Sequence, residues 1–307
     1  MMLSNPQVPW TEEQWARVNQ AIQEEAQNAR VAADFLPLYG PLSPDTDFVR
    51  RGDIPYTAPL RINDTNVLQL ATLQIRVVLR GAQLADPEMS SALSLFRRAA
   101  NVIARLEDAL IFNGRHTPPQ PPPRRRLRYH GEDAIGLLDR ARYFGPPATN
   151  GNTLVDAIAA AIGRLEDDGH FGPFAVALGH DLFLAAQTPM APLTDVIPRD
   201  RIIPFLRGGS LVRSSALPHN EGVVVALGGE PVQFVVATDI SLQFLQVTTD
   251  PNFVFRVYEK VALRIKGEHA IGLLAPAAPP PPPPPPSPGP GGAAGTGGAG
   301  RGGRPHR

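Results

Sequence analysis

Histidines and carboxylates are the residues that could hold a metal ion or act as acid–base catalysts in this chain, which has seven histidines. His170 and His180 flank an apolar run, so they could approach each other, with Glu166, Asp167 and Asp168 nearby. No two histidines stand four residues apart on a helix beside a carboxylate, which is the arrangement of zinc-dependent proteases. The three carboxylates follow a helix end, where solvated charges are common. We therefore predict no metal site.

Other residue types that carry catalytic chemistry occur without their motifs. The absence of cysteine excludes disulfides, zinc–thiolate sites and thiol nucleophiles. Ser210, Ser214 and Ser215 lie outside any nucleophile elbow, and the paired glycines lack the Gly-Lys-Ser or Gly-Lys-Thr end of a phosphate-binding loop. Glu107 and Asp108 are adjacent on a predicted helix and diverge by about 100°, so they form no catalytic dyad. We expect no catalytic residue, no cofactor and no enzymatic activity.

Composition narrows the class of protein. The 29 basic residues balance 29 acidic residues, so bulk charge does not indicate a nucleic-acid partner. No apolar run approaches the roughly 18 residues of a membrane-spanning helix. The first ten residues lack the basic and apolar segments of a signal peptide. We expect a cytoplasmic protein that binds neither nucleic acid nor membrane.

Residues 12–30 are predicted to form an amphipathic helix on an N-terminal arm. Thr11 and Gln14 make a capping box, and Trp10 and Trp15 occupy the two positions of a hydrophobic staple. One face carries apolar residues at helical spacing: Trp15, Val18, Ile22, Ala26 and Ala29. This stripe has two interpretations. It packs on the chain's own domain, or it belongs to an inward-facing surface that receives a partner.

The segment after this helix is predicted to be a long arm. Residues 37–66 contain five prolines, which exclude a continuous helix. Alternating apolar and polar residues then predict a strand over 67–80. Such an arm buries little by itself, so it makes physical sense if it lies on a neighbouring subunit.

A long helix and a compact α/β region complete the predicted fold. Asp86 is a good N-cap and Gly114 a natural C-cap for a helix of about 26 residues, which would be about 39 Å long and suits a structural spine. Gly228 and Gly229 are predicted to form a hairpin turn. Further helices are predicted over 153–167 and 181–187, and strands over 174–178, 211–214, 223–227, 232–237, 242–248 and 253–265.

Two stretches have compositions that build no core. Residues 118–126 form a Pro- and Arg-rich connector, which favours an extended conformation. Residues 275–307 are Pro-rich and then Gly-rich, so we predict a disordered tail.

Several segments, in order, resemble the encapsulin shell proteins, also called linocin-type encapsulating proteins, whose fold is that of tailed-phage major capsid proteins. The resemblance covers about residues 10–270. Ala237 and Thr238 depart from it, since the family usually has Gly-Gln there, as do the connector and the tail. The similar segments are Leu106–Gly114 with its acidic pair and Ile-Phe-x-Gly end, Gly172–Gly179, Leu211–Leu217, Gly222–Gly229, Val235–Leu242 and Phe253–Glu259.

The resemblance implies an α+β, phage major-capsid-like fold. Its N-terminal helix would line a shell interior, its extended loop would clasp a neighbour, the tips of its axial domain would surround pores, and its tail would lie outside. The implied parts are an N-terminal arm with an amphipathic helix (1–36), an extended loop (37–84), a peripheral domain with the spine helix and connector (85–149, joined by 250–274), an axial domain (150–249) and the tail (275–307).

The implied function is that of a structural shell subunit of an encapsulin nanocompartment. Copies would assemble into a large icosahedral homo-oligomer. The cargo, a peroxidase or a ferritin-like iron-storage protein, would be bound through a short targeting peptide. Trp15, Val18 and Ile22 are the candidates for cargo contact on the inner wall. The alternatives are a major capsid protein of a phage or prophage, and a protease or bacteriocin activity.

Overall fold

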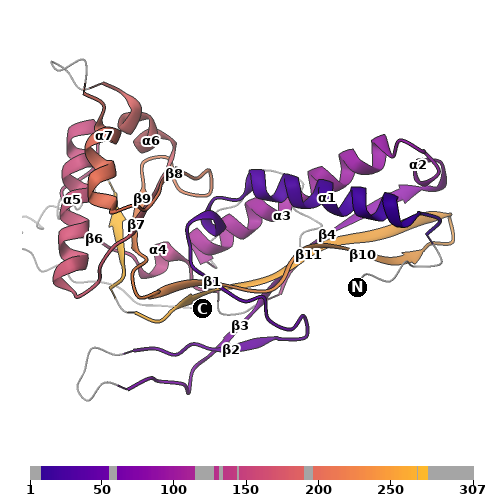
Figure 1. The fold of residues 1–307 in the computed structure, drawn as a ribbon, viewed down its shortest axis with the longest axis horizontal. Helices are drawn as coiled ribbons and strands as arrows, with labels where there is room; N and C mark the ends of the chain where they lie inside the picture. Colours follow the sequence, from indigo (N-terminus) through magenta and orange to yellow (C-terminus); the bar gives the residue numbers. More distant parts are fainter. Residues whose placement is uncertain are drawn as a thin grey trace, which may run out of the picture. The chain divides into compact units, whose positions relative to one another are not determined.

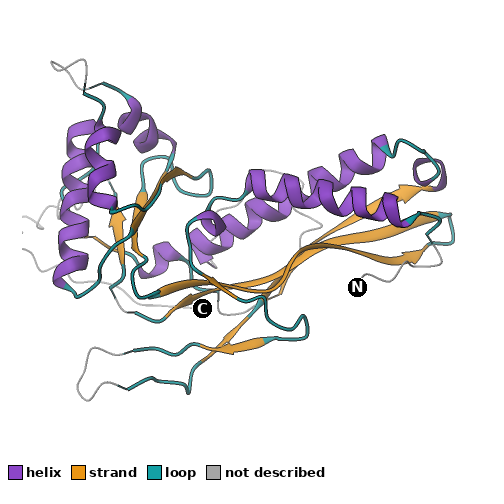
Figure 2. Ribbon diagram, viewed as in Figure 1, coloured by secondary structure: helices purple, strands orange, loops and turns teal. Residues whose placement is uncertain are grey.

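The structure is a computed structural model that describes residues 8–54, 61–114, 128–130, 134–143, 145–189, 196–267 and 269–275. Residues 1–277 form one compact unit, and residues 278–307 form a second that lies outside the described residues. The predicted connector at 118–126 and nearly all of the predicted tail also fall outside them. The described part is α+β, with two five-stranded sheets and one two-stranded sheet (Figure 2).

The first sheet is built around two long antiparallel strands. Because both strands alternate apolar and polar residues over most of their length, one face of this sheet is apolar and must be covered. Its strand order is β1 (Leu38–Tyr39), β10 (Val232–Val247), β11 (Asn252–Ile265), β4 (Ala71–Arg80) and β5 (Arg128–His130).

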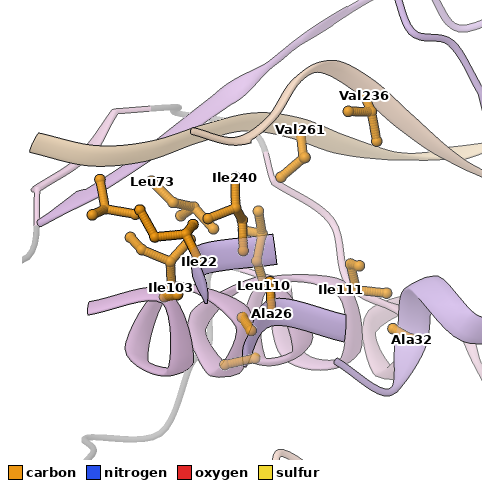
Figure 3. Packing of buried hydrophobic residues seen from close by; sticks show 14 of the residues in the cluster. Ile22, Ala26, Ala32, Leu73, Ile103, Leu110, Ile111, Val236, Ile240 and Val261 are labelled. Carbon is orange, nitrogen blue, oxygen red and sulfur yellow. The ribbon is translucent and has the colours of Figure 1, made fainter. Parts of the chain in front are cut away.

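Helices α1 (Glu12–Ala29) and α3 (Ser90–Asn113) lie side by side over that apolar face (Figure 1). Figure 3 shows Ile22 of α1 and Ile103 of α3 pointing toward Ile240 of β10 and Leu73 of β4. The Trp10 ring stacks on Phe255 of β11 with centroids 5.3 Å apart. The two helices and the sheet therefore share one core.

The second sheet carries its own helical layer. Helices α5 (Gly151–Asp167), α6 (His180–Gln187) and α7 (Pro198–Ile202), with the 3₁₀ turn η4 (Ile203–Leu206), share a buried cluster with it. Its other face joins the first core, since Val223 and Val225 pack with α3 residues. The strand order is β6 (Arg142–Tyr143), β12 (Ile271–Leu274), β9 (Gly222–Ala226), β7 (Phe174–Leu178) and β8 (Leu211–Arg213).

The helix predictions are confirmed in type, with one correction in extent. The Thr11 hydroxyl accepts from the Gln14 N–H, and the Gln14 side chain accepts from the Thr11 N–H, so the predicted capping box is present. The spine helix α3 begins at Ser90, not at Asp86. Asp86 accepts instead from the N–H groups of Glu88 and Ser90, and so closes a turn between α2 (Gly81–Leu84) and α3. Met89 in this turn is left-handed, at φ 54°. Gly114, at φ 56°, ends α3 as predicted.

The predicted hairpin at Gly228 and Gly229 is wrong. The strand before these glycines, β9, pairs with β7 and β12, whereas β10 after them pairs with β1 and β11 in the other sheet. The glycines make a tight turn, with the Glu230 N–H donating to the Leu227 carbonyl at 3.0 Å, but the chain crosses between sheets there. The strands predicted at 232–237 and 242–248 are also one strand, β10.

Two segments pair with strands outside the domain to which the resemblance assigned them. Residues 271–274 were expected in the peripheral domain with 250–265, but β12 pairs with β9 and β6 of the second sheet. Residues 232–247 were expected in the axial domain, but β10 belongs to the first sheet. Pairing partners depend on contacts distant in sequence, which local patterns do not carry.

Replacing Ile22 by alanine tests the packing of α1 on the sheet. Ile22 is 1% exposed, so removing its buried methyl groups should lower the free energy of unfolding by about 2–5 kcal/mol. Gln20 is exposed on the same helix, and Gln20→Ala should change it by less than about 0.5 kcal/mol. Denaturant unfolding followed by circular dichroism measures both, and equal effects would contradict the packing.

Candidate assembly surface

A two-stranded hairpin presents apolar side chains to solvent. Strands β2 (Phe48–Arg50) and β3 (Val67–Gln69) pair antiparallel in a sheet separate from the two larger ones (Figure 1). Phe48, Ile62 and Val67 are 56%, 64% and 63% exposed. An isolated two-stranded hairpin is marginally stable, and its outer edges offer unpaired backbone groups. These properties favour a binding surface for another chain.

The base of this hairpin is fixed to the first sheet. Lys260 Nζ on β11 lies 2.5 Å from Asp47 Oδ1, and the Arg264 Nε–H donates to the Arg51 carbonyl at 3.0 Å. A buried apolar cluster backs these polar contacts, consisting of Leu68, Leu70, Val235, Ala237 and Ala262. The segment from Asp47 to Ile54 is therefore anchored to the first sheet, because the Ile54 N–H also donates to the Lys266 carbonyl at 3.0 Å, while Phe48, Ile62 and Val67 stay accessible.

The three residues predicted to contact a cargo occupy different environments. Val18 is 0% and Ile22 is 1% exposed, and both lie in the core between α1, α3 and the first sheet. Trp15 is half-buried beside Trp10, with ring centroids 5.0 Å apart. The stripe thus packs on the chain's own domain, one of the two interpretations above. In this arrangement only Trp15 is accessible to a partner.

A buried charge cluster forms where α1 ends. The Arg30 guanidinium reaches three carboxylates from three other elements: Nε lies 2.8 Å from Glu107 Oε2 on α3, and Nη2 lies 2.6 Å from Glu259 Oε1 on β11 and 2.5 Å from Asp239 Oδ1 on β10. Glu107 and Glu259 are completely buried. The cluster therefore joins the end of the N-terminal helix to the spine helix and to the sheet.

Asp108 binds the backbone just after this junction. Its Oδ1 accepts from the N–H groups of Val31 at 3.1 Å and Ala32 at 2.8 Å, at the start of the 3₁₀ turn η1 (Ala32–Asp34). Burial raises the pKa of Asp108 to about 7, although these two N–H groups favour the anion. Glu107 and Asp108 thus contact different groups, as the helical divergence of adjacent residues predicts.

The structure separates the residues that could have formed a metal site. His170 and His180 lie beyond opposite ends of β7, so the extended strand separates them. The Glu166 carboxylate pairs with Arg207 at 2.8 Å, and Asp168 lies 3.6 Å from His269. Within the described ranges, no group of three His, Cys, Asp or Glu side chains is placed to hold a metal ion.

Arg30, Asp239 and Glu259 were not predicted from the sequence as functional residues. A signal existed for Glu259: it stands on the same face of its strand as Phe255, Val257 and Val261, where alternation calls for an apolar residue. A carboxylate at such a position is buried and needs a cation. Arg30 and Asp239 gave no comparable signal, because they meet Glu259 only through the tertiary fold.

The long described helices are amphipathic rather than uniformly apolar. In the part of the chain that the structure describes, no helix combines the length and apolar character needed to cross a membrane.

Replacing Asp108 by asparagine tests its raised pKa. Relative to the unfolded chain, the folded chain favours the protonated acid, so this contribution to stability is present below about pH 4 and is lost as pH rises through about 7. Asparagine keeps an acceptor oxygen but cannot ionise. The unfolding free energy of Asp108→Asn minus that of wild type should therefore grow by a few kcal/mol over this pH range. A difference that is constant with pH, measured by denaturant unfolding, would contradict it.

Comparisons with known proteins agree with this architecture. The family model "Encapsulating protein for peroxidase" (Linocin_M18) matches residues 1–118 and 131–262. The type 1 encapsulin shell protein EncA of Myxococcus xanthus is 28% identical over 286 residues, covering 88% of this chain and 94% of that protein.

Solved structures share the fold at low sequence identity. A virus-like particle from Pyrococcus furiosus has a TM-score of 0.64 at 15% identity, covering 86% of this chain and 100% of that one. The capsid of Myoviridae phage XM1 has a TM-score of 0.58 at 13% identity, covering 80% and 91%. The fold is therefore that of phage capsid proteins, as the resemblance implied. Because the family model covers most of the sequence, the chain belongs to the Linocin_M18 family of encapsulating proteins.

Proposed function

We propose that this chain is the structural subunit of a closed icosahedral shell, built from copies of itself, that encloses a cargo protein. The observation that carries the proposal is the hairpin of β2 and β3, which is anchored to the first sheet and exposes the apolar side chains of Phe48, Ile62 and Val67, in a chain of the encapsulating family.

A second copy of the chain is the partner that this hairpin fits best. Every subunit of a homo-oligomer offers the same hairpin and the same receiving surface, so the contact repeats around closed symmetry. Permanent interfaces commonly bury about 2,000 Å² or more. An extended hairpin reaches such an area more readily than a compact surface does.

The role proposed here is structural and not catalytic. The cargo that we favour is a peroxidase, which the family's description names, and a ferritin-like iron protein is the second candidate. A short targeting peptide on the cargo would provide the attachment. The cytoplasmic location proposed for the shell rests on the family resemblance alone.

A phage capsid subunit remains the second candidate function, because phage XM1 shares the fold. The fold at 13% identity does not separate a cargo container from a genome container. The family match favours the container for protein. Particles purified from the native host would distinguish the two by their contents.

The assembly proposal predicts that charges on the hairpin prevent particle formation. Ile62 and Val67 are exposed, so the double variant Ile62→Asp, Val67→Asp should fold and yet yield at least about tenfold fewer particles, since each interface would bury unpaired carboxylates. Negative-stain microscopy and native mass spectrometry measure the yield. Gln27→Asp, on the exposed face of α1, should assemble normally. Normal particles from the double variant would refute the role of the hairpin.

The cargo proposal now centres on Trp15 among the three predicted residues. Val18 and Ile22 support the core, so their substitution would destabilise the chain before it revealed a cargo contact. Trp15→Ala should leave particles intact and reduce the captured cargo several-fold, because a partly exposed aromatic ring is a typical anchor for a docked peptide. The mass ratio of cargo to shell in purified particles measures this. An unchanged ratio would exclude Trp15 from the docking surface.

A further inference from the structure

The buried cluster around Arg30 has more negative than positive groups. One guanidinium faces the carboxyl groups of Glu107, Glu259 and Asp239, of which the first two are 0% exposed and Asp239 is half-exposed. If all three were ionised, two buried anions and one partly buried anion would share one cation. Leaving a buried charge without compensation is costly, and such groups commonly bind a proton instead.

The cluster also leaves buried carboxylate oxygens without a hydrogen-bond donor. Glu107 Oε1 and Oε2 and Glu259 Oε2 accept no hydrogen bond, because the Arg30 Nε–H, although Nε lies 2.8 Å from Glu107 Oε2, is not aligned to donate one. Both carboxyl groups bind the same guanidinium, Glu107 at Nε and Glu259 at Nη2, so they lie close together, and two carboxyl groups can hydrogen-bond to each other only when one of them carries a proton. A single proton therefore supplies the missing donor and removes one of the excess charges.

We propose that this cluster binds one proton between Glu107 and Glu259, and that the bound proton locks the N-terminal helix onto the spine helix and the sheet. The inference concerns the folded chain itself and does not depend on the proposed function. The bound proton makes the attachment of the N-terminal helix depend on pH, which a simple ion pair would not do, because the helix is released when the proton is lost as the pH rises.

The pKa values of both buried glutamates are shifted in the direction that favours a bound proton. Burial raises the pKa of Glu259 well above its ordinary value, and the neighbouring Glu107 carboxylate raises it further. Burial also raises the pKa of Glu107, but Arg30 opposes that rise. The two buried glutamates therefore hold one proton between them in the folded chain.

Every packed element contributes a charged group to this site. The junction after α1 supplies Arg30 and Asp34, α3 supplies Glu107 and Asp108, β10 supplies Asp239 and β11 supplies Glu259. Apart from Arg30, all of these groups are acids, so rising pH can only add negative charge. Burial raises the pKa of Asp34 too, while Arg30 lowers it.

The sign of the pH dependence follows. The pKa of Glu259 is raised on folding, so its contribution to stability is present at low pH and is lost as pH rises through that raised pKa. Deprotonated Glu259 then repels Glu107 and Asp239 across Arg30, and the junction at the end of α1 loosens.

The two tryptophans provide a direct readout of this opening. They are the only tryptophans in the chain, and both lie on the N-terminal arm. Trp10 is 6% exposed, stacks on Phe255 and donates its indole N–H to the Leu84 carbonyl at 3.1 Å. When α1 leaves the sheet, Trp10 enters water, and the tryptophan emission moves to longer wavelength.

The test is a pH titration of tryptophan emission on the full-length assembled protein, from about pH 5 to about pH 11. Wild type should show a red shift as pH rises. Glu259→Gln keeps a donor toward Glu107 but cannot ionise, so its midpoint should lie at least about one pH unit higher, or the transition should disappear. Glu221→Gln is the matched control, because burial also raises the pKa of Glu221 but it lies far from Arg30 in sequence, next to β9, and its midpoint should equal that of wild type.

Two results would overturn the proposal: no emission change in wild type, or the same midpoint in wild type and Glu259→Gln. Light scattering in the same samples reports particle size, so disassembly is distinguished from release of the helix. If Glu259→Gln does not fold, infrared spectroscopy of wild type decides the question. A buried protonated carboxyl band at neutral pH that vanishes together with the emission transition supports the lock, and its absence refutes it.

Discussion

The apolar face of the sheet formed by β10, β11 and β4 is the constraint on which the rest of the chain depends. A face that carries Phe255, Val257 and Val261 cannot remain in water, and α1 and α3 are the elements that cover it. Covering it fixes the N-terminal arm against the spine helix. It also commits the opposite face of the same sheet, near Val235 and Ala262, to anchoring the hairpin of β2 and β3. The N-terminal arm and the hairpin of β2 and β3 therefore take their positions from the two faces of one sheet.

The same face contains a point where the core is ionic rather than apolar, the Arg30 cluster. An apolar replacement for a buried ion pair is often as stable or more stable, so the Arg30 cluster is not explained by stability alone. Its geometry offers another reason. The charged groups come from α3, β10, β11 and the end of α1, and Arg30 can bind all three carboxylates only when these elements pack in one arrangement. The cluster therefore specifies where α1 ends, which apolar contacts alone would fix less sharply.

The parts of the fold that sequence could predict are those determined by neighbouring residues. The capping box of Thr11 and Gln14 and the C-cap at Gly114 are local chemistry, and both are present. The turn at Gly228 is also determined by neighbouring residues. Whether the strands on either side of it pair with each other depends on contacts distant in sequence. Strand β10 was divided in the prediction because its register shifts between Val236 and Ser241, which interrupts the alternation. Glu259 was overlooked for a related reason, since burial of a polar residue depends on partners distant in sequence.

Sharing this fold with a phage capsid has a physical consequence for where the function is encoded. An anchored hairpin, a spine helix and two sheets build a closed container whatever the container holds, so they cannot select its contents. Selection must lie on surfaces that the core does not use. On α1, the inward face is committed to the sheet through Val18 and Ile22, whereas the opposite face is polar and exposed, with Arg17, Gln20 and Glu24. That face can vary without disturbing the core, and under the proposed function it is a surface on which we expect the contents of the container to be selected.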